Sequence, residues 1–212
     1  MPEILEVEAA RRVLDARALA REIGRVHAPD AWFLKRGTTG VALRHALVGN
    51  RFTEARRRGK QIVLDTEDPD VRIGVHLGMS GQARLKPAGS ELHSHVRVLL
   101  GFHDSETELH YTDQRMFGGL LVDELLEAGD GERVPTRAAH IARDIMDPKF
   151  DIEAAVDAIS ARSAGIKSVI LNQEVVSGFG NIYADEALWA AALHYAKPAG
   201  RISRAKLTEL LQ

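Results

Sequence analysis

The spacing of hydrophobic and polar residues changes along the chain. In residues 3–20, apolar side chains recur at helical spacing with charged side chains opposite, which predicts an amphipathic helix. From about residue 22 to 122 the period is two, as in VRIGVHL, HVRVLLGF and KQIVLDT, and turn-like sequences separate these strand candidates. This half of the chain therefore predicts a β-sandwich or flattened barrel with a helix at its start.

After this β-rich half the pattern becomes helical. An acidic stretch with glycines at 123–136 is typical of a linker. The segments with helical spacing beyond it are 137–146, 151–162, 167–176, 181–193 and 203–212. We therefore predict an α+β chain: a β-sandwich domain at 1–122, the linker, and an all-α domain at 137–212. The last helical pattern stops without a capping residue, which is typical of a portion of something longer.

The composition is that of a globular protein. A chain of 212 residues with 45% hydrophobic content is long enough to bury a sizeable core, and no apolar run approaches the ~18 residues of a membrane span. The start of the sequence has no secretory pattern, and the absence of cysteine excludes disulfides and thiolate metal sites. We expect a cytoplasmic protein, with a monomer as the default.

The charges are unevenly distributed, although the formal net charge is only −2. A basic run contains Arg56, Arg57, Arg58 and Lys60. Acids gather in LLVDELLEAGDGE, at Asp123, Glu124, Glu127, Asp130 and Glu132. Two interpretations of the basic run stay open: a local basic face for nucleic acid, and a solvated charged hairpin.

The sequence opens MPEILEVEAA, and Pro2 has two interpretations. One is that Pro2 starts the helix, because proline is favoured at the first helical position. The other is that Met1 is removed, which leaves Pro2 with a free secondary amine. An α-amino group has a pKa of about 7.7–8.0, and the positive end of a helix dipole eases its deprotonation. Attack of a secondary amine on a carbonyl-like carbon gives an iminium ion, which favours elimination at the adjacent carbon.

Two glutamates lie close to this amine in the sequence. Glu3 is adjacent and Glu6 shares its face of the helix, so both are candidates for proton transfer. The alternative is that they are ordinary first-turn charges that stabilise the helix dipole. Both interpretations stay open on these residues alone.

Three further stretches carry residues suited to contact with DNA. In NQEVVSGFGNIYADEALW a helix ends, turns through glycines and restarts at Asn181, which offers N–H donors to a phosphate, and Lys167 adds a point charge. HLGMSG and TDQRMFGG place Met79 and Phe117 in glycine-flanked turns, with Arg115 two positions before Phe117. Such side chains act as wedges into a base stack. The ordinary alternatives are a helical hairpin and two tight turns with an apolar residue tucked inward.

Together these stretches resemble the formamidopyrimidine-DNA glycosylase / endonuclease VIII family of base-excision repair enzymes. PEILEVE is similar to the family's PELPEVE. RRRGK, HLGMSG, the DxRxFG pattern at 113–118 and GFGNIYADE follow in the family's order. The resemblance spans residues 2 to about 212. It implies a DNA glycosylase with AP lyase activity that removes oxidised bases from damaged double-stranded DNA, with a helix–two-turn–helix in its second domain.

The resemblance also implies roles for ten residues. Pro2 would attack C1′ of the damaged nucleotide, expel the base and form an iminium intermediate, and β/δ elimination would cut the strand on both sides of the sugar. Glu3 would assist opening of the sugar ring, with Glu6 beside it. The residues that would contact DNA are Lys60, Lys167 and Asn181 at phosphates, Tyr183 close by, and Met79, Arg115 and Phe117 in the gap left by the flipped nucleotide. This Met/Arg/Phe set is closer to the oxidised-purine branch than to endonuclease VIII.

The sequence departs from the family pattern in three places. Family members usually carry a zinc finger with four cysteines whose hairpin arginine grips DNA. This sequence has neither, so we expect no zinc cofactor and DNA binding that weakens at higher salt. Leu5 replaces the second proline of PELPEVE, and Met116 stands where a basic residue is frequent. The sequence does not fix the preferred lesion among 8-oxoguanine, ring-opened purines and oxidised pyrimidines.

Two other functions stay open. One is a lesion-binding or lyase-only relative or fragment, which the missing finger favours and the presence of Pro2, Glu3 and Lys60 disfavours. The other is a small-molecule enzyme that uses an N-terminal proline as a base, as tautomerases do. The tautomerase alternative is disfavoured because a helix, not a strand, is predicted directly after the proline.

Overall fold

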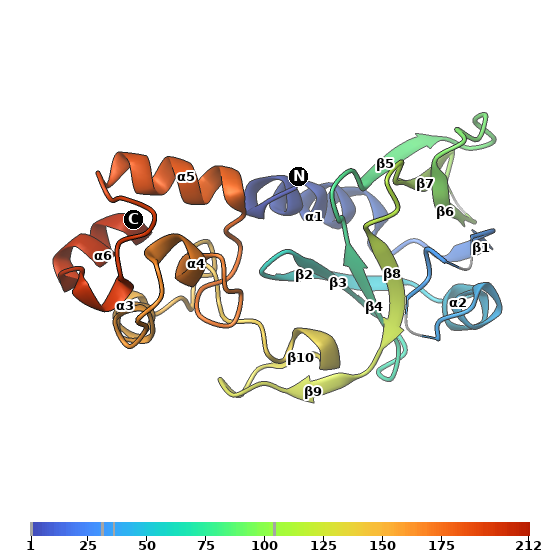
Figure 1. The fold of residues 1–212 in the computed structure, drawn as a ribbon. Helices are drawn as coiled ribbons and strands as arrows, with labels where there is room; N and C mark the ends of the chain where they lie inside the picture. The colour runs from blue at the N-terminus through green and yellow to red at the C-terminus, as the bar shows by residue number, and fades with distance from the viewer. Residues whose placement is uncertain (1, 31, 36, 104) are drawn as a thin grey trace. The chain divides into compact units, whose positions relative to one another are not determined.

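The computed structural model of the chain describes residues 2–30, 32–35, 37–103 and 105–212. The chain divides into two compact units, Met1–Ala139 and His140–Gln212 (Figure 1). The first unit holds the N-terminal helix and the strands, and the second is helical. This arrangement confirms the predicted α+β fold. No helix within the described ranges is long and apolar enough to cross a membrane.

Among the described residues, the strands of the first unit form two four-stranded antiparallel sheets. One sheet has the order β1-β6-β7-β5, with bounds Ile23–His27, Val96–Phe102, Thr107–Thr112 and Gln82–Pro87. The other has the order β2-β3-β4-β8, with bounds Phe52–Arg58, Gln61–Thr66, Arg72–His76 and Gly119–Asp123. Both sheets contribute alternate apolar side chains to one hydrophobic core. The predicted sandwich, including the three quoted strands, is confirmed.

Two helices pack on this sandwich. The first, α1 (Ile4–Ala18), buries Val7 and Leu14 and confirms the helix expected at 3–20. The second, α2 (Gly40–Leu47), lies where only strands were predicted. Thr39 caps it by accepting a hydrogen bond from the Ala42 N–H at 3.0 Å. Its apolar face is only two turns long, which is too short to stand out against the period-two pattern around it.

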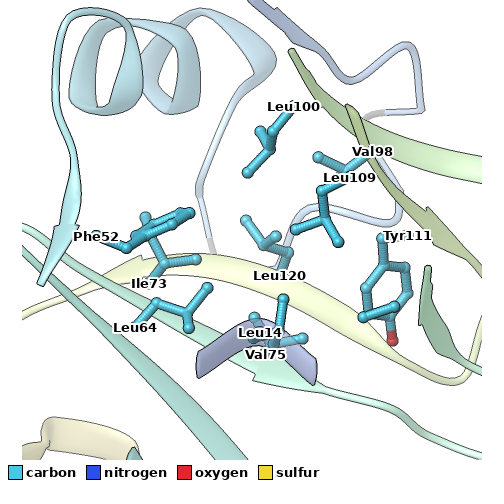
Figure 2. A pocket seen from close by; sticks show the side chains of 11 residues that line it. Leu14, Phe52, Leu64, Ile73, Val75, Val98, Leu100, Leu109, Tyr111 and Leu120 are labelled. Atoms are coloured by element: carbon cyan, nitrogen blue, oxygen red, sulfur yellow. The ribbon is translucent and has the colours of Figure 1, made fainter. Parts of the chain in front are cut away.

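The core of the first unit contains a small apolar cavity (Figure 2). Its lining comes from α1 and both sheets: Leu14, Phe52, Leu64, Ile73, Val75, Ala83, Val98, Leu100, Leu109, Tyr111 and Leu120. The cavity measures about 20 Å³, room for little more than one water molecule. The lining residue with a polar group, Tyr111, donates its hydroxyl to the His76 carbonyl at 2.8 Å. We therefore regard the cavity as a gap in packing and not as a ligand site.

The predicted linker at 123–136 is wrong in one respect, because most of it is folded. Strands β9 (Leu125–Glu127) and β10 (Arg133–Pro135) pair antiparallel, and the short 3₁₀-helix η1 (Thr136–Ala138) follows. The acids of the hairpin contact the neighbouring sheet: Asp130 accepts a hydrogen bond from Arg58 at 2.9 Å. Part of the acidic composition of this stretch therefore serves ion pairing, while Glu124 and Glu127 are exposed.

The second unit packs its helices around a core of its own. The helices are α3 (Ile152–Ser160), α4 (Ile166–Ile170), α5 (Asn181–Ala190), η2 (Ala199–Arg201) and α6 (Arg204–Leu211). The helices expected at 151–162, 181–193 and 203–212 are thereby confirmed, with shorter ends. Apolar side chains at helical spacing build this core, for example Val156 and Ile159, which are fully buried.

Two of the helices predicted after residue 136 were predicted too long. The helix expected at 137–146 is only η1, because Asp144 bridges to Ser177 in extended form and the Ser177 hydroxyl donates to the Ala142 carbonyl at 2.7 Å. The helix expected at 167–176 ends at Ile170. Beyond it, the Asn172 side chain accepts from the Glu174 N–H at 3.0 Å, a local turn that competes with the helix.

Candidate active site and nucleic-acid interface

Pro2 does not occupy the first helical position. Helix α1 begins at Ile4 and Glu3 is its N-cap, so Pro2 precedes the cap by one residue. The interpretation of Pro2 as a favourable first helical residue is therefore wrong. Met1, on whose removal the other interpretation depends, lies outside the described residues.

Glu3 and Glu6 together cap the start of α1. The Glu3 N–H donates to Glu6 Oε2 at 2.9 Å, and the Glu3 side chain accepts from the Glu6 N–H, which makes a reciprocal capping box. Glu3 is only 1% exposed. Both glutamates thus belong to the helix start, the capping box holds the Glu3 carboxylate in a fixed place next to Pro2, and their role in proton transfer stays a prediction.

Lys60 lies in the turn between β2 and β3. Arg58 pairs with Gln61, which leaves Gly59 and Lys60 as a two-residue turn. Gly59 has φ +54° and Lys60 has no positive φ, the pattern of a type II′ hairpin turn, which needs glycine at its first position. Burial lowers the pKa of the Lys60 ammonium, and the charge of Glu3 opposes this shift. Lys60 therefore lies within electrostatic range of the α1 cap.

His76 is a neighbour of this site that the sequence reasoning missed. It ends β4, and its pKa is lowered by burial and by the charge of Lys60. Its Nδ1 accepts a hydrogen bond from the Gly78 N–H at 3.1 Å. The sequence did carry a signal for this residue, because His76 is the first residue of HLGMSG. The hydrophobic alternation of VRIGVHL had placed it only among the polar positions of a strand.

Three arginines of the basic run are paired inside the first unit. Arg56 donates to Asp65 at 2.9 Å, Arg57 to Glu8 at 3.1 Å, and Arg58 to Asp130 at 2.9 Å. The side chains of Arg57 and Arg58 are 7% and 8% exposed, and guanidinium groups so buried require partners. Neither open interpretation of the run holds for them, because they form neither a basic face nor a solvated hairpin.

The two glycine-flanked turns meet in space. Gly78 has φ +62°, and a Cβ placed there would lie 2.2 Å from the Gly118 backbone nitrogen. Asp113, which is fully buried, holds the two turns together. Its Oδ1 accepts from the Ser80 hydroxyl at 2.5 Å and its Oδ2 from the Gly118 N–H at 2.8 Å. The sequence reasoning had not connected Ser80 with Asp113.

This framework presents three side chains to solvent. Met79 is 37% and Phe117 59% exposed, and Arg115 is exposed with its guanidinium 5.3 Å from the centre of the Phe117 ring. The alternative in which these apolar residues are tucked inward is therefore wrong. Met116, at the turn, has φ +57°. Exposed apolar groups on hydrogen-bonded loops suit insertion into a base stack.

In the helical unit, the predicted phosphate contacts lie along α4 and α5. Asn181 is the exposed first residue of α5, with Gly180 as its N-cap. Lys167 on α4 pairs with Asp185 at 2.7 Å. Tyr183 is half-buried against the helical core. Within the described residues, no three His, Asp or Glu side chains gather in a way that would hold a metal ion.

Comparison with known proteins matches both units. The family profile described as "Formamidopyrimidine-DNA glycosylase N-terminal domain" matches residues 1–120, and "Formamidopyrimidine-DNA glycosylase H2TH domain" matches residues 141–212. A formamidopyrimidine-DNA glycosylase of Mycobacterium avium is 44% identical over 214 residues, covering all of this chain and 74% of the relative. One of Streptomyces coelicolor is 42% identical over 213 residues, covering all of this chain and 73% of the relative.

Solved structures agree with these sequence matches. The Lactococcus lactis Fpg in a complex with abasic-site-containing DNA superimposes with a TM-score of 0.84 at 26% identity, over 99% of this chain and 75% of that chain. The same protein with N7-benzyl-Fapy-dG-containing DNA gives 0.84 at 27% identity, over 99% and 74%. The fold and the paired turns define a protein with an N-terminal β-sandwich unit followed by a helix–two-turn–helix unit. The chain belongs to the formamidopyrimidine-DNA glycosylase family.

Proposed function

We propose that this chain is a base-excision repair DNA glycosylase with AP lyase activity that removes oxidised bases from damaged double-stranded DNA, working at the bacterial nucleoid. The observation that carries the proposal is the arrangement at the N-terminal end of α1. There Pro2 adjoins the buried carboxylate of Glu3, and Lys60 lies within electrostatic range of that carboxylate. Family membership supports the same conclusion, as do the lesion-containing DNAs bound by the Lactococcus lactis relative.

The chemistry follows from a secondary amine at this position. With Met1 removed, the Pro2 nitrogen attacks C1′ of the damaged nucleotide, the bond from C1′ to the base breaks, and the base leaves with its electron pair. The proton that the amine loses passes to the Glu3 carboxylate, and Glu3 returns it to the ring oxygen as the bond from C1′ to that oxygen breaks and the sugar opens. The resulting iminium has no N–H to lose, so it keeps its positive charge. It makes the C2′ protons acidic: loss of one of them to water breaks the bond to the 3′ phosphate, and a second elimination, with loss of the C4′ proton to water, breaks the bond to the 5′ phosphate.

The nucleotide must leave the stack before C1′ can be reached, at a cost of a few kcal/mol. Met79, Phe117 and Arg115 compensate by filling the space that the nucleotide vacates, with Arg115 facing the orphaned base. Their support on Asp113 and on the Gly78–Gly118 contact reduces the ordering that insertion requires.

Phosphate contacts position the strand without reading its sequence. Lys60 in the β2–β3 turn would bind near the lesion, and Lys167 and the α5 N-terminus with Asn181 would hold the backbone. This sequence-independent grip suits a repair enzyme, because damage occurs in any sequence.

Borohydride trapping tests the proposal. The chain is incubated with duplexes that carry one abasic site or one 8-oxoguanine, and the covalent adduct is measured on a gel. We expect adducts with both duplexes from the wild type and a loss of at least about tenfold for Pro2→Gly, whose primary amine gives an imine that must be protonated before elimination. An adduct with abasic DNA only would reduce the proposal to a lyase, and binding without any adduct would contradict it in favour of a lesion-binding protein.

A further inference from the structure

Arg57 connects the helix that carries Pro2 with the turn that carries Lys60. From strand β2 its Nε donates to Glu8 Oε2, on the second turn of α1, at 3.1 Å. Its Nη1 donates to the Gly59 carbonyl, inside the β2–β3 turn, at 2.9 Å. One planar guanidinium therefore holds two pieces of the proposed site that lie about fifty residues apart in the sequence.

The Glu8 end of this connection is strongly ionic. Glu8 also accepts from Arg11 at 3.0 Å and from Arg12 at 2.9 Å. Burial works against the charged carboxylate, but the hydrogen bonds of the three arginines outweigh it and lower the pKa of Glu8 to about 2. Arg11 also donates to the Ala55 carbonyl of β2 at 2.9 Å, a second bond from the helix to this strand. The partner of Arg57 is therefore a carboxylate at any physiological pH.

We propose that Arg57 is a positioning residue, which fixes the Gly59–Lys60 turn against α1 so that the Lys60 ammonium keeps its place relative to Pro2 and Glu3. The inference rests on the proposed function, because it assigns Arg57 to that same site. It adds a residue of the basic run that acts through Lys60 and touches no DNA, since its side chain is 7% exposed and turned to α1.

Arginine suits this role for a geometric reason. Its guanidinium offers donors in a rigid fork, so one group satisfies both the Glu8 carboxylate and the Gly59 carbonyl. The lysine ammonium is a point charge on a flexible stem and fixes such a pair of acceptors less well. The neighbour Arg56 provides a matched control, because it lies on the same strand, carries the same charge and pairs with Asp65 of β3.

The test compares Arg57→Gln, Arg57→Lys and the control Arg56→Gln. Single-turnover adduct formation on abasic-site DNA is measured at saturating protein, and the Kd for the same duplex is measured separately. Misplacement of a group by about 1 Å costs up to about 100-fold in rate, so we expect Arg57→Gln to slow trapping about 10- to 100-fold. We expect the Kd of Arg57→Gln to stay within about threefold of the wild-type value. We expect the trapping rate of Arg57→Lys to lie between the rates of the wild type and Arg57→Gln, and the trapping rate of Arg56→Gln to stay within about twofold of wild type. Arg57→Gln should fold, because Glu8 keeps Arg11 and Arg12 as partners.

Equal slowing by Arg57→Gln and Arg56→Gln would overturn the inference, and so would a loss of affinity as large as the loss of rate. If the wild type itself forms no adduct, the proposed function is contradicted, and a measurement without DNA decides the inference. The lysines are ¹³C-dimethylated, and Lys60→Arg assigns the Lys60 signal. A titration midpoint of Lys60 that moves toward that of an ordinary lysine in Arg57→Gln, and stays put in Arg56→Gln, supports the inference. An unmoved midpoint overturns it.

Discussion

Gly78 and Gly118 show how single residues decide the shape of this site. Their backbones approach so closely that a methyl group at Gly78 would lie 2.2 Å from the Gly118 nitrogen. Glycine is required there for space as well as for its φ of +62°. The contact fixes the loops that carry Met79 and Phe117, which makes two glycines as important to the proposed wedge as the side chains themselves.

We expect Gly78→Ala to destabilise the first unit more than Gly89→Ala. Gly89 has a similar φ of +77° but open space around its Cα, so alanine there carries only the backbone cost, about 1–2 kcal/mol. At Gly78 the clash adds to that cost, and we expect a further loss of about 2 kcal/mol. Urea unfolding of both variants measures the difference. Equal losses would mean that the two turns do not meet.

At the scale of elements, hydrophobic spacing predicted those helices and strands that form because they bury apolar side chains. The strand Gln61–Thr66 and the helix Ile152–Ser160 follow from their apolar patterns, because one face of each lies on a core. The end of α4 at Ile170 and the hairpin at 125–135 were missed. Side-chain hydrogen bonds of Asn172 and ion pairs of Asp130 decide these, and neither leaves a periodic signal.

The candidate site was predictable to a similar extent. Residues at the tips of turns, such as Met79, Phe117 and Lys60, are recognisable from glycines and motif order. Their supports were not, because the bonds from Asp113 to Ser80 and from Arg57 to Glu8 join segments more than thirty residues apart. Spacing along a sequence carries no information on such contacts.

The α4–α5 pair yields a prediction about salt. Asp185 neutralises Lys167 at 2.7 Å before any phosphate arrives, so DNA must displace it. We expect Asp185→Asn to raise affinity up to about fivefold at low salt, since an exposed pair is worth at most about 1 kcal/mol. The plot of log affinity against log salt should also steepen by up to about 0.9. The control is Glu186→Gln, the exposed neighbouring carboxylate of the same helix. Identical slopes for the two variants would exclude the competition.

At the scale of the whole molecule, the arginines of the basic run form ion pairs within the first unit. Arginines of the basic run pair with acids from α1, β3 and the β9–β10 hairpin. The acidic stretch and the basic run, which look independent in the sequence, therefore meet at Arg58, which pairs with Asp130 and Glu132. The cations that the proposal assigns to DNA are few: Lys60, Arg115 and Lys167, which must first leave Asp185.

Acid unfolding tests this arrangement at Glu8. Its pKa in the folded chain is about 2, below the ordinary value of 4.5, so its contribution to stability is present above pH 4.5. That contribution is lost as the pH falls from 4.5 to about 2, because protonation breaks the bonds to the arginines. We expect the free energy of unfolding of the wild type to fall more steeply across this range than that of Glu8→Gln. Parallel curves from chemical denaturation would contradict the ion-pair account.

The central claim is that the nitrogen of Pro2 is the nucleophile, and the position of the trapped sugar tests it most directly. The borohydride-reduced adduct is digested with a protease and a nuclease, and tandem mass spectrometry locates the residual sugar. We predict that the sugar lies on the nitrogen of Pro2, in a peptide that lacks Met1. A sugar on Lys60 or on any other lysine, or on a chain that keeps Met1, would contradict the account.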